Sequence, residues 1–294
     1  MKKAIAVLLL LVFALSYAAW SYLSHPHGDQ KVSYEPSKIE CGSGKSGKWK
    51  YCIHHALQGD NGGVAYLLHG RNLDERTWND DTFYTSLVQE YWQSNAQKPP
   101  VVITVSFGPV WLLAPKNSAP ASGLLETFLN EVIPEIELQV GQPKYRAVFG
   151  ESMGGLNSLI AGLGSRNLFQ KVAALCPGVY KESPFSSLNV LKQAMERTGA
   201  EPMVILGILS IAKSYAGNAE EWDHFNPLKL ADQIDAISSP AFYISAPLYD
   251  KYGNFEGTRE LAQKLKAKGV QTIWRPVYGG HCAVDVGSLA DFLL

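Results

Sequence analysis

A serine between glycines is the feature of this sequence best suited to covalent chemistry. The run Gly150-Glu151-Ser152-Met153-Gly154-Gly155 lies between a segment that predicts a strand and one that predicts a helix. In a G-x-S-x-G elbow the serine is held at a strained tip, and the glycines leave room for neighbouring backbone. The helix that follows directs free N–H groups toward a developing oxyanion. Ser152 is therefore the candidate nucleophile, and the alternative is a chance Gly/Ser turn.

A serine hydroxyl needs a base, and the sequence contains seven histidines from which to choose. His281 follows the predicted strand 272–277, and active sites of open α/β sheets lie beyond the carboxyl ends of strands. Asp250 follows the predicted strand 241–245 and lies between the serine and the histidine in sequence, where the acid of such a triad is expected. The sequence predicts a Ser152–Asp250–His281 triad. Ordinary loop positions for the aspartate and the histidine are the alternative.

The oxyanion of an ester intermediate needs two N–H donors. One is expected from Met153, directly after the nucleophile, and the other from the loop that follows the apolar run 64–68. Arg71 is the expected donor in this loop, with Asn72 one step further on, whereas His69 is interpreted as structural. No His/Asp cluster has convincing metal-ligand spacing, so we expect no metal and no cofactor.

Strand and helix signals alternate over most of the chain, which indicates a mostly parallel sheet with helices on both faces. The predicted strands cover 64–68, 100–106, 145–149, 172–175, 241–245 and 272–277, and the predicted helices cover about 82–92, 124–138, 153–163, 258–268 and 284–293. Residues 180–237 break this rhythm and predict an inserted helical cap. We expect one α/β domain over residues 31–294.

The glycine-rich segment 42–47 matches two phosphate-binding patterns by letter only. A dinucleotide fingerprint must open a helix, and a P-loop needs Ser or Thr where Trp49 stands. The segment is therefore interpreted as the tip of a β-hairpin. Cys41 and Cys52 flank this tip, and we expect a disulfide between its two strands.

Two further cysteines, Cys176 and Cys282, each follow a predicted strand. They form either a second disulfide or two buried thiols.

The N-terminal residues 1–24 have the features of a targeting segment. Two lysines precede an uncharged apolar run, and small residues at Ser16 and Ala18 are typical of a signal peptide cut after Ala18. The run 4–23 is also long enough to serve as an uncleaved membrane anchor. The position of the lysines favours export in either case, to the periplasm or the cell exterior.

The overall composition excludes several classes of protein. The chain has 294 residues, with 26 Lys and Arg against 27 Asp and Glu, and 46% of it is hydrophobic. A general nucleic-acid binder needs a basic face, and a disordered chain is less apolar. We therefore expect a globular protein with no nucleic-acid partner.

Together these motifs resemble the α/β-hydrolase superfamily, and within it the esterases related to esterase D, S-formylglutathione hydrolase, feruloyl esterases and antigen-85-like acyltransferases. The resemblance covers residues 64–294. It is carried by Leu67-Leu68-His69-Gly70 with Trp78, the helix 128–137, the elbow, and Gly280-His281. It implies a sheet of about eight mostly parallel strands and hydrolysis of carboxylic esters through an acyl-enzyme.

Two departures limit this resemblance. The insertion 180–237 matches no particular subfamily. Some feruloyl esterases and tannases carry Cys directly before the serine and directly after the histidine, but here Glu151 precedes Ser152 although Cys282 follows His281.

The sequence thus predicts an exported serine esterase that acts on a small-molecule, lipid or sugar ester. Acyl transfer to a sugar or lipid alcohol by the same triad is one alternative, and a non-catalytic envelope binding protein on a hydrolase scaffold is another. Membrane association through the N-terminal segment is also considered. Trp111 lies in an apolar loop after the strand 100–106, where it either lines a substrate groove or packs as an ordinary loop residue.

Overall fold

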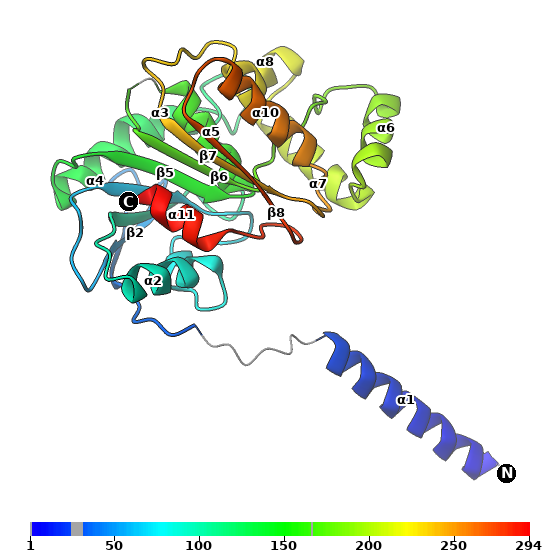
Figure 1. Cartoon of the computed structure of the whole chain (residues 1–294). Coiled ribbons are helices and arrows are strands. Elements are labelled where there is room, and N and C mark those ends of the chain that lie inside the picture. The colour runs from blue at the N-terminus through cyan, green and yellow to red at the C-terminus, as the bar shows by residue number, and fades with distance from the viewer. Residues whose placement is uncertain (1, 25–31, 166) are drawn as a thin grey trace. The chain divides into compact units, whose positions relative to one another are not determined.

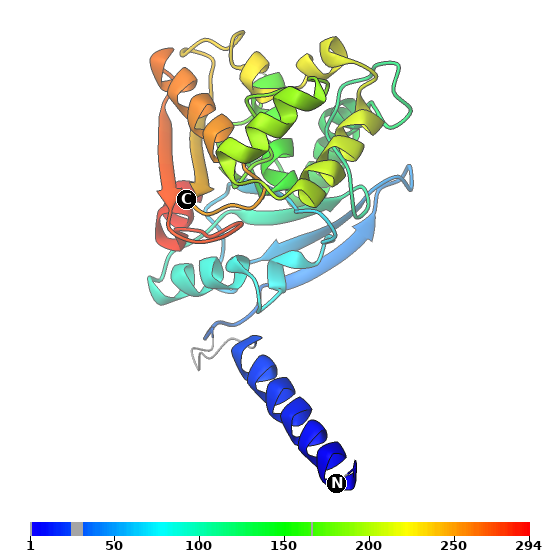
Figure 2. The same cartoon turned by 90° about the vertical axis from the view of Figure 1, so that its right-hand side faces the viewer.

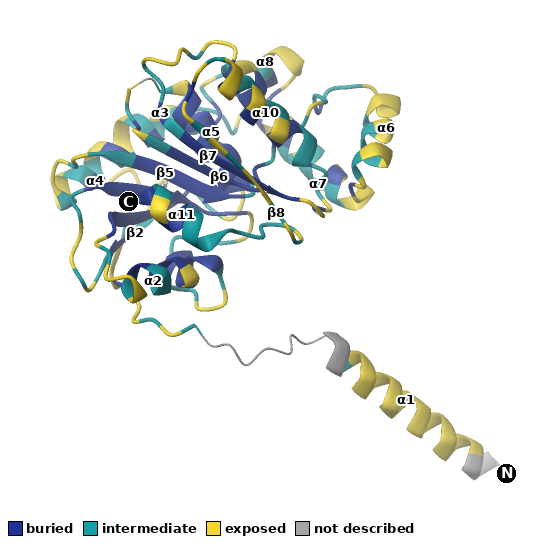
Figure 3. Cartoon of the chain, in the orientation of Figure 1, coloured by how far each residue is buried: buried dark blue, intermediate teal, exposed yellow. Residues whose placement is uncertain are grey.

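The computed structural model describes residues 2–24, 32–165 and 167–294, and the chain forms two compact units, Met1–Ser33 and Tyr34–Leu294. The predicted domain start at residue 31 lies outside the described residues. The first unit contains helix α1 (Lys2–Ser24), along which the side chains of residues 5–20 are exposed (Figure 3). Among the described residues, no helix has the length and apolar character required to cross a membrane.

The second unit is built on one sheet of eight strands (Figure 1). They are β1 (Lys38–Ser43), β2 (Lys50–His55), β3 (Val64–Leu68), β4 (Val101–Ser106), β5 (Arg146–Glu151), β6 (Lys171–Leu175), β7 (Ala241–Pro247) and β8 (Thr272–Val277). Their order across the sheet is β1-β2-β4-β3-β5-β6-β7-β8. Strands β1 and β2 form an antiparallel hairpin, and β2 pairs antiparallel with β4. Strands β3 to β8 run parallel to one another. The predicted mostly parallel sheet is confirmed.

Helices cover both faces of the sheet. Those outside the segment between β6 and β7 are η1 (Thr77–Asn79), α2 (Tyr84–Ser94), α3 (Leu124–Thr127), η2 (Phe128–Val132), α4 (Ile133–Val140), α5 (Met153–Gly164), α10 (Phe255–Ala267) and α11 (Val286–Leu293). The predicted helix 124–138 is thus three successive helical segments. Figure 1 shows α2 and α11 together on one face.

The hydrophobic core divides into two layers, one on each face of the sheet. Alternate side chains of β3 point to opposite faces, as a strand requires. Val64, Tyr66 and Leu68 belong to the core layer that includes side chains of α5 and α10, whereas Ala65 and Leu67 belong to the layer that includes side chains of α2 and α11. Burial on both faces explains why the central strands are continuous apolar runs without polar alternation.

Four helices lie between β6 and β7, in the segment predicted as a cap. They are α6 (Leu188–Thr198), α7 (Pro202–Tyr215), α8 (Ala219–Asp223) and α9 (Pro227–Leu230), and Figure 2 shows them grouped together. Helix-initiating residues lie at their N-terminal ends. The side chains of Ser187, Asn218 and Asn226 each accept a backbone N–H as an N-cap, and Pro202 is the first residue of α7.

The hairpin contains the expected disulfide. Cys41 and Cys52 face each other in the register of β1 and β2, with Cα atoms 4.1 Å apart, and their sulfurs are bonded.

Candidate active site

The nucleophile elbow connects β5 to α5. Ser152 has φ 55° and ψ −115°, a conformation that side chains rarely adopt and that surrounding contacts must hold. Its N–H donates to Leu175 O at 2.9 Å, and its own carbonyl accepts from Leu156 N–H at 3.0 Å. The turn is therefore fixed to the end of β6 and to the first turn of α5.

Close backbone contacts explain the glycines of the elbow. A Cβ on Gly150 would lie 2.1 Å from Leu68 O, and one on Gly154 would lie 1.7 Å from the same atom. A Cβ on Gly155 would approach Leu175 O at 2.8 Å. The motif thus lets the elbow pack directly against the ends of β3 and β6.

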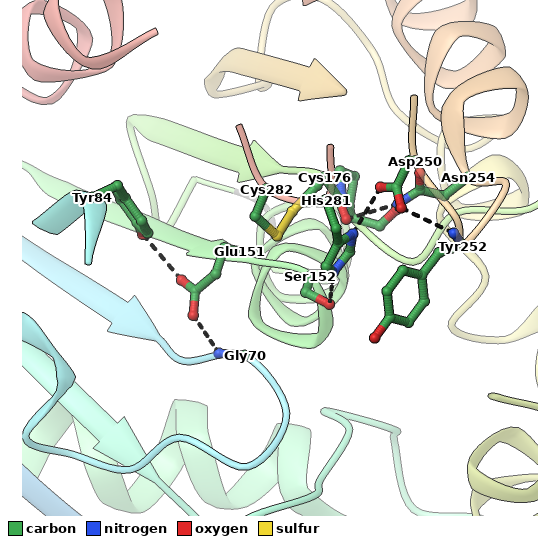
Figure 4. Close-up of a disulfide and its surroundings, with 11 residues drawn as sticks. Gly70, Tyr84, Glu151, Ser152, Cys176, Asp250, Tyr252, Asn254, His281 and Cys282 are labelled. Atoms are coloured by element: carbon green, nitrogen blue, oxygen red, sulfur yellow. Dashed lines mark hydrogen bonds and ion pairs between the residues drawn. A yellow bond between two sulfur atoms is a disulfide. The ribbon is translucent and has the colours of Figure 1, made fainter. Parts of the chain in front are cut away.

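The structure brings together the three residues predicted as a triad (Figure 4). His281 Nε2 lies 3.0 Å from Ser152 Oγ, and His281 Nδ1 lies 2.8 Å from Asp250 Oδ2. Because a carboxylate only accepts, Nδ1 carries the proton, and Nε2 is left to accept from the serine hydroxyl. Each residue follows the carboxyl end of a parallel strand: β5, β7 or β8.

The Asp250 carboxylate is buried and held at both oxygens, since its Oδ1 accepts Tyr252 N–H at 3.0 Å. The ring of Tyr252 stacks on His281 with centroids 4.0 Å apart and an interplanar angle of 28°. Asn254 Nδ2 donates to the carbonyls of Cys176 and Pro177, at 2.9 Å each. The loop after β7 is therefore tied to the end of β6. Sequence reasoning missed Tyr252 and Asn254, although both lie within four positions of the predicted acid.

A second disulfide decides between the two alternatives left open for the remaining cysteines. Cys176 follows β6, Cys282 follows His281 directly, and their sulfurs are bonded (Figure 4). Both residues have positive φ, 42° and 60°. Among the described residues, these two sulfurs and the His281 ring are the only group with metal-ligand spacing, but a disulfide offers no thiolate pair. The bridge instead tethers the histidine loop to the sheet.

The backbone donors expected for the oxyanion differ in availability. Asn72 N–H donates to Pro109 O at 2.8 Å and is therefore occupied. Within the part of the chain that the structure describes, Arg71 N–H and Met153 N–H have no hydrogen-bond partner. Both residues line the same pocket as Ser152. This arrangement favours Arg71 over Asn72.

Glu151 links the nucleophile elbow to the loop that follows β3 and contains Gly70 and Arg71, here called the oxyanion loop. Its side chain points away from Ser152, toward the loop that holds Arg71 (Figure 4). Oε1 accepts Gly70 N–H at 2.5 Å, and Oε2 accepts the Tyr84 hydroxyl at 3.0 Å. The carboxyl is 2% exposed, and burial raises its pKa to about 7 although both hydrogen bonds act in the opposite direction. Sequence reasoning noted Glu151 only as a departure from a family pattern.

Trp111 is not among the residues that line the pocket at Ser152, which favours the second of its two alternatives, packing as an ordinary loop residue. Its side chain is 1% exposed, its Nε1–H donates to His69 Nε2 at 3.2 Å, and its ring packs on Phe107 at 5.1 Å. A buried acceptor for the indole N–H explains this inward orientation. The next residue, Leu112, lines the pocket instead. His69 Nε2 also accepts from the Ser106 hydroxyl at 2.8 Å, and burial lowers the pKa of His69.

The pocket beside Ser152 is largely apolar. Its wall comes from the oxyanion loop, α5, the segment after β6, α7, α8 and the loop after β7. The lining residues are Arg71, Leu112, Ser152, Met153, Leu156, Gly178, Tyr180, Ile208, Ile211, Ala212, Trp222 and Tyr252. His281 is not among them.

Comparison with protein families gives a match over most of the chain. The family described as "Putative esterase" matches residues 50–285. The chain belongs to this esterase family. A search of curated proteins finds no matching sequence. The esterase is thus a carboxylic ester hydrolase, as its family resemblance implied.

Solved structures confirm the α/β-hydrolase fold of the esterase. One is a ferulic acid esterase, with 19% identity, 87% of this chain and 94% of that chain covered, and a TM-score of 0.60. A second is an S-formylglutathione hydrolase from Agrobacterium tumefaciens, with 15% identity, 90% and 95% covered, and a TM-score of 0.58. A third is the thermostable carboxylesterase EstE1 from a metagenomic library, with 17% identity, 90% and 88% covered, and a TM-score of 0.61.

Proposed function

We propose that the protein is an exported serine esterase whose catalytic triad is Ser152, His281 and Asp250. The observation that carries this proposal is the continuous chain of contacts from Ser152 Oγ to His281, at 3.0 Å, and from His281 to Asp250, at 2.8 Å. This chain lies beside an apolar pocket. A nucleophile, a base and an orienting acid in hydrogen-bond reach are the parts that acyl transfer needs.

In the acylation step, Ser152 Oγ attacks the ester carbonyl carbon while His281 Nε2 takes the hydroxyl proton. The carbonyl oxygen becomes an oxyanion, which the N–H groups of Met153 and Arg71 bind. Asp250 stabilises the imidazolium that forms and holds its tautomer. When the C–O bond to the alcohol breaks, the departing oxygen takes the proton from Nε2, and an acyl-enzyme remains.

Water completes the reaction by the same route. His281 Nε2 removes a proton from a water molecule, whose oxygen attacks the acyl carbon, and a second oxyanion forms between the same two donors. Collapse returns the proton to Ser152 Oγ and releases the carboxylic acid. Each preorganised oxyanion donor contributes a factor of about 10² to 10³ in kcat in comparable enzymes.

Two features support export. The N-terminal segment 1–24 has two lysines before an apolar run, and the protein contains two disulfides. Disulfides persist in oxidising compartments such as the periplasm or the cell exterior. The mass of the mature protein isolated from cells shows whether the segment is removed after Ala18 or retained.

Hydrolysis of p-nitrophenyl acetate and labelling by a fluorophosphonate test the triad. We expect the wild type to hydrolyse the ester and to be labelled once, at Ser152. Ser152→Ala should lose both properties, whereas Ser94→Ala, which changes an exposed serine at the end of α2, should keep them. Equal rates for wild type and Ser152→Ala would refute the proposal, and an unlabelled wild type would favour a non-catalytic binding protein.

Product analysis separates hydrolysis from acyl transfer. The acyl-enzyme can be attacked by water or by another hydroxyl group, and the triad does the same work in both cases. We expect free carboxylic acid as the product even when a sugar or lipid alcohol is added. A new ester as the main product would identify the protein as an acyltransferase.

A further inference from the structure

A second cavity adjoins the pocket at Ser152. It lies between α6, α7 and the loop after β7. The two spaces share five wall residues: Tyr180, Ile208, Ala212, Trp222 and Tyr252. Because the same side chains line both, the two cavities are direct neighbours, and Ser152 lines only the first of them.

The wall of the second cavity is mainly aliphatic. Helix α6 contributes Leu191, Ala194 and Met195, and α7 contributes Ile205 and Leu209.

The acidic side chains at this wall are paired. Glu182 and Glu256 accept from Arg197 at 2.7 and 2.9 Å. Lys181 also lines the cavity, and it lies 3.9 Å from Glu260. The cavity therefore favours an uncharged, flexible, apolar occupant over a polar one.

One face of α7 runs along both spaces. Ile205, Ile208 and Ala212 are spaced by three and four residues, so they lie on the same side of the helix. Ile208 and Ala212 line both spaces, whereas Ile205 lines only the second. The seven residue-to-residue steps from Ala212 to Ile205 extend about 10 Å, the length of an alkyl chain of roughly eight carbons.

The position of His281, the proposed base, decides whether the acyl half or the alcohol half of an ester would enter the second cavity. The alcohol takes its proton from His281 Nε2 as it leaves, so it must lie beside that atom. His281 lines neither the pocket nor the second cavity. The acyl half is therefore the part directed toward α7. In an interior that is otherwise closely packed, an apolar cavity next to the pocket of the nucleophile is a candidate ligand site.

We propose that the second cavity binds the distal part of a long aliphatic acyl chain, and that the preferred substrates are esters of fatty acids longer than about eight carbons. The inference rests on the proposed function, since it assumes attack by Ser152. It assigns Ala194 and Met195 of α6, together with Ile205 of α7, as specificity-determining residues.

A series of p-nitrophenyl esters from acetate to palmitate, assayed below their aggregation concentrations with the full-length protein, tests this inference. Ala194→Trp fills the second cavity and should lower kcat/KM for decanoate and longer esters at least about tenfold, with acetate unchanged. Gln193→Trp places the same side chain on the exposed side of α6 and is the matched control. Met195→Ala enlarges the cavity and should shift the preference toward longer chains.

The outcomes separate this inference from the proposed function. If the wild type hydrolyses acetate but neither α6 variant changes the chain-length profile, the acyl-chain site is refuted. If Ala194→Trp instead slows long alkyl acetates, the cavity holds the alcohol and the inference is also wrong. If Ala194→Trp does not fold, the profile of Met195→Ala decides. Loss of acetate hydrolysis in Ser152→Ala, together with a loss of decanoate but not of acetate hydrolysis in Ala194→Trp, supports both.

Discussion

Replacing Glu151 by glutamine should make the stability of the protein less dependent on pH. Burial raises the pKa of this carboxyl from its ordinary value of 4.5 to about 7. Between these two pH values the unfolded chain has lost the proton and the folded protein retains it, so the folded state binds more protons and stability falls as pH rises. The raised pKa corresponds to about 3 kcal/mol of stability that is present below pH 4.5 and lost by pH 7 to 8.

Glu151→Gln removes the ionisation and keeps an acceptor for Gly70 N–H. We therefore expect the variant to gain about 3 kcal/mol of stability relative to the wild type between pH 4.5 and pH 8. Stability here is the free energy of unfolding. Urea unfolding at several pH values, followed by tryptophan fluorescence with the disulfides intact, measures it. Glu220→Gln, which changes an exposed carboxylate of α8, is the control. A difference that stays constant with pH would refute the view that burial suppresses the ionisation of Glu151.

Two further predictions concern the histidine loop. Asp250→Asn should keep the fold but reduce kcat about 10⁴-fold, because an amide stabilises the wrong tautomer of His281; a loss below tenfold, measured with p-nitrophenyl acetate, would contradict this role. Replacing Cys176 and Cys282 together by serine opens a loop of 106 residues and should cost up to about 5 kcal/mol of stability, against about 3 kcal/mol for the 11-residue hairpin bridge. Urea unfolding of the two double variants checks this order, and equal losses would contradict it.

The sheet and the proximity of Ser152, Asp250 and His281 were predictable because their signals are local. Central strands are buried on both faces, so each appears as a short apolar run, and parallel strands deliver the residues that follow them to one edge of the sheet. Ser152, Asp250 and His281 each follow such a run. The elbow was recognisable because close backbone contacts require its glycines.

The features that were missed depend on contacts between residues far apart in sequence. Glu151 meets Gly70 and Tyr84 across 81 and 67 positions, and no sequence pattern pairs it with either residue. Trp111 is buried because His69, 42 positions away, accepts its indole N–H. Tertiary partners of this kind determine which way a side chain points, and periodicity in the sequence carries no information about them.

The pairing of the cysteines also bears on how the native bonds arise during biosynthesis. Four cysteines can pair in three ways, and here the first joins the second and the third joins the fourth. If the chain is exported with its N-terminus first, Cys41 and Cys52 meet before the later pair has arrived, and Cys176 then waits for Cys282. The native pattern follows from the order of arrival, so oxidation alone completes it and no wrong bond has to be exchanged.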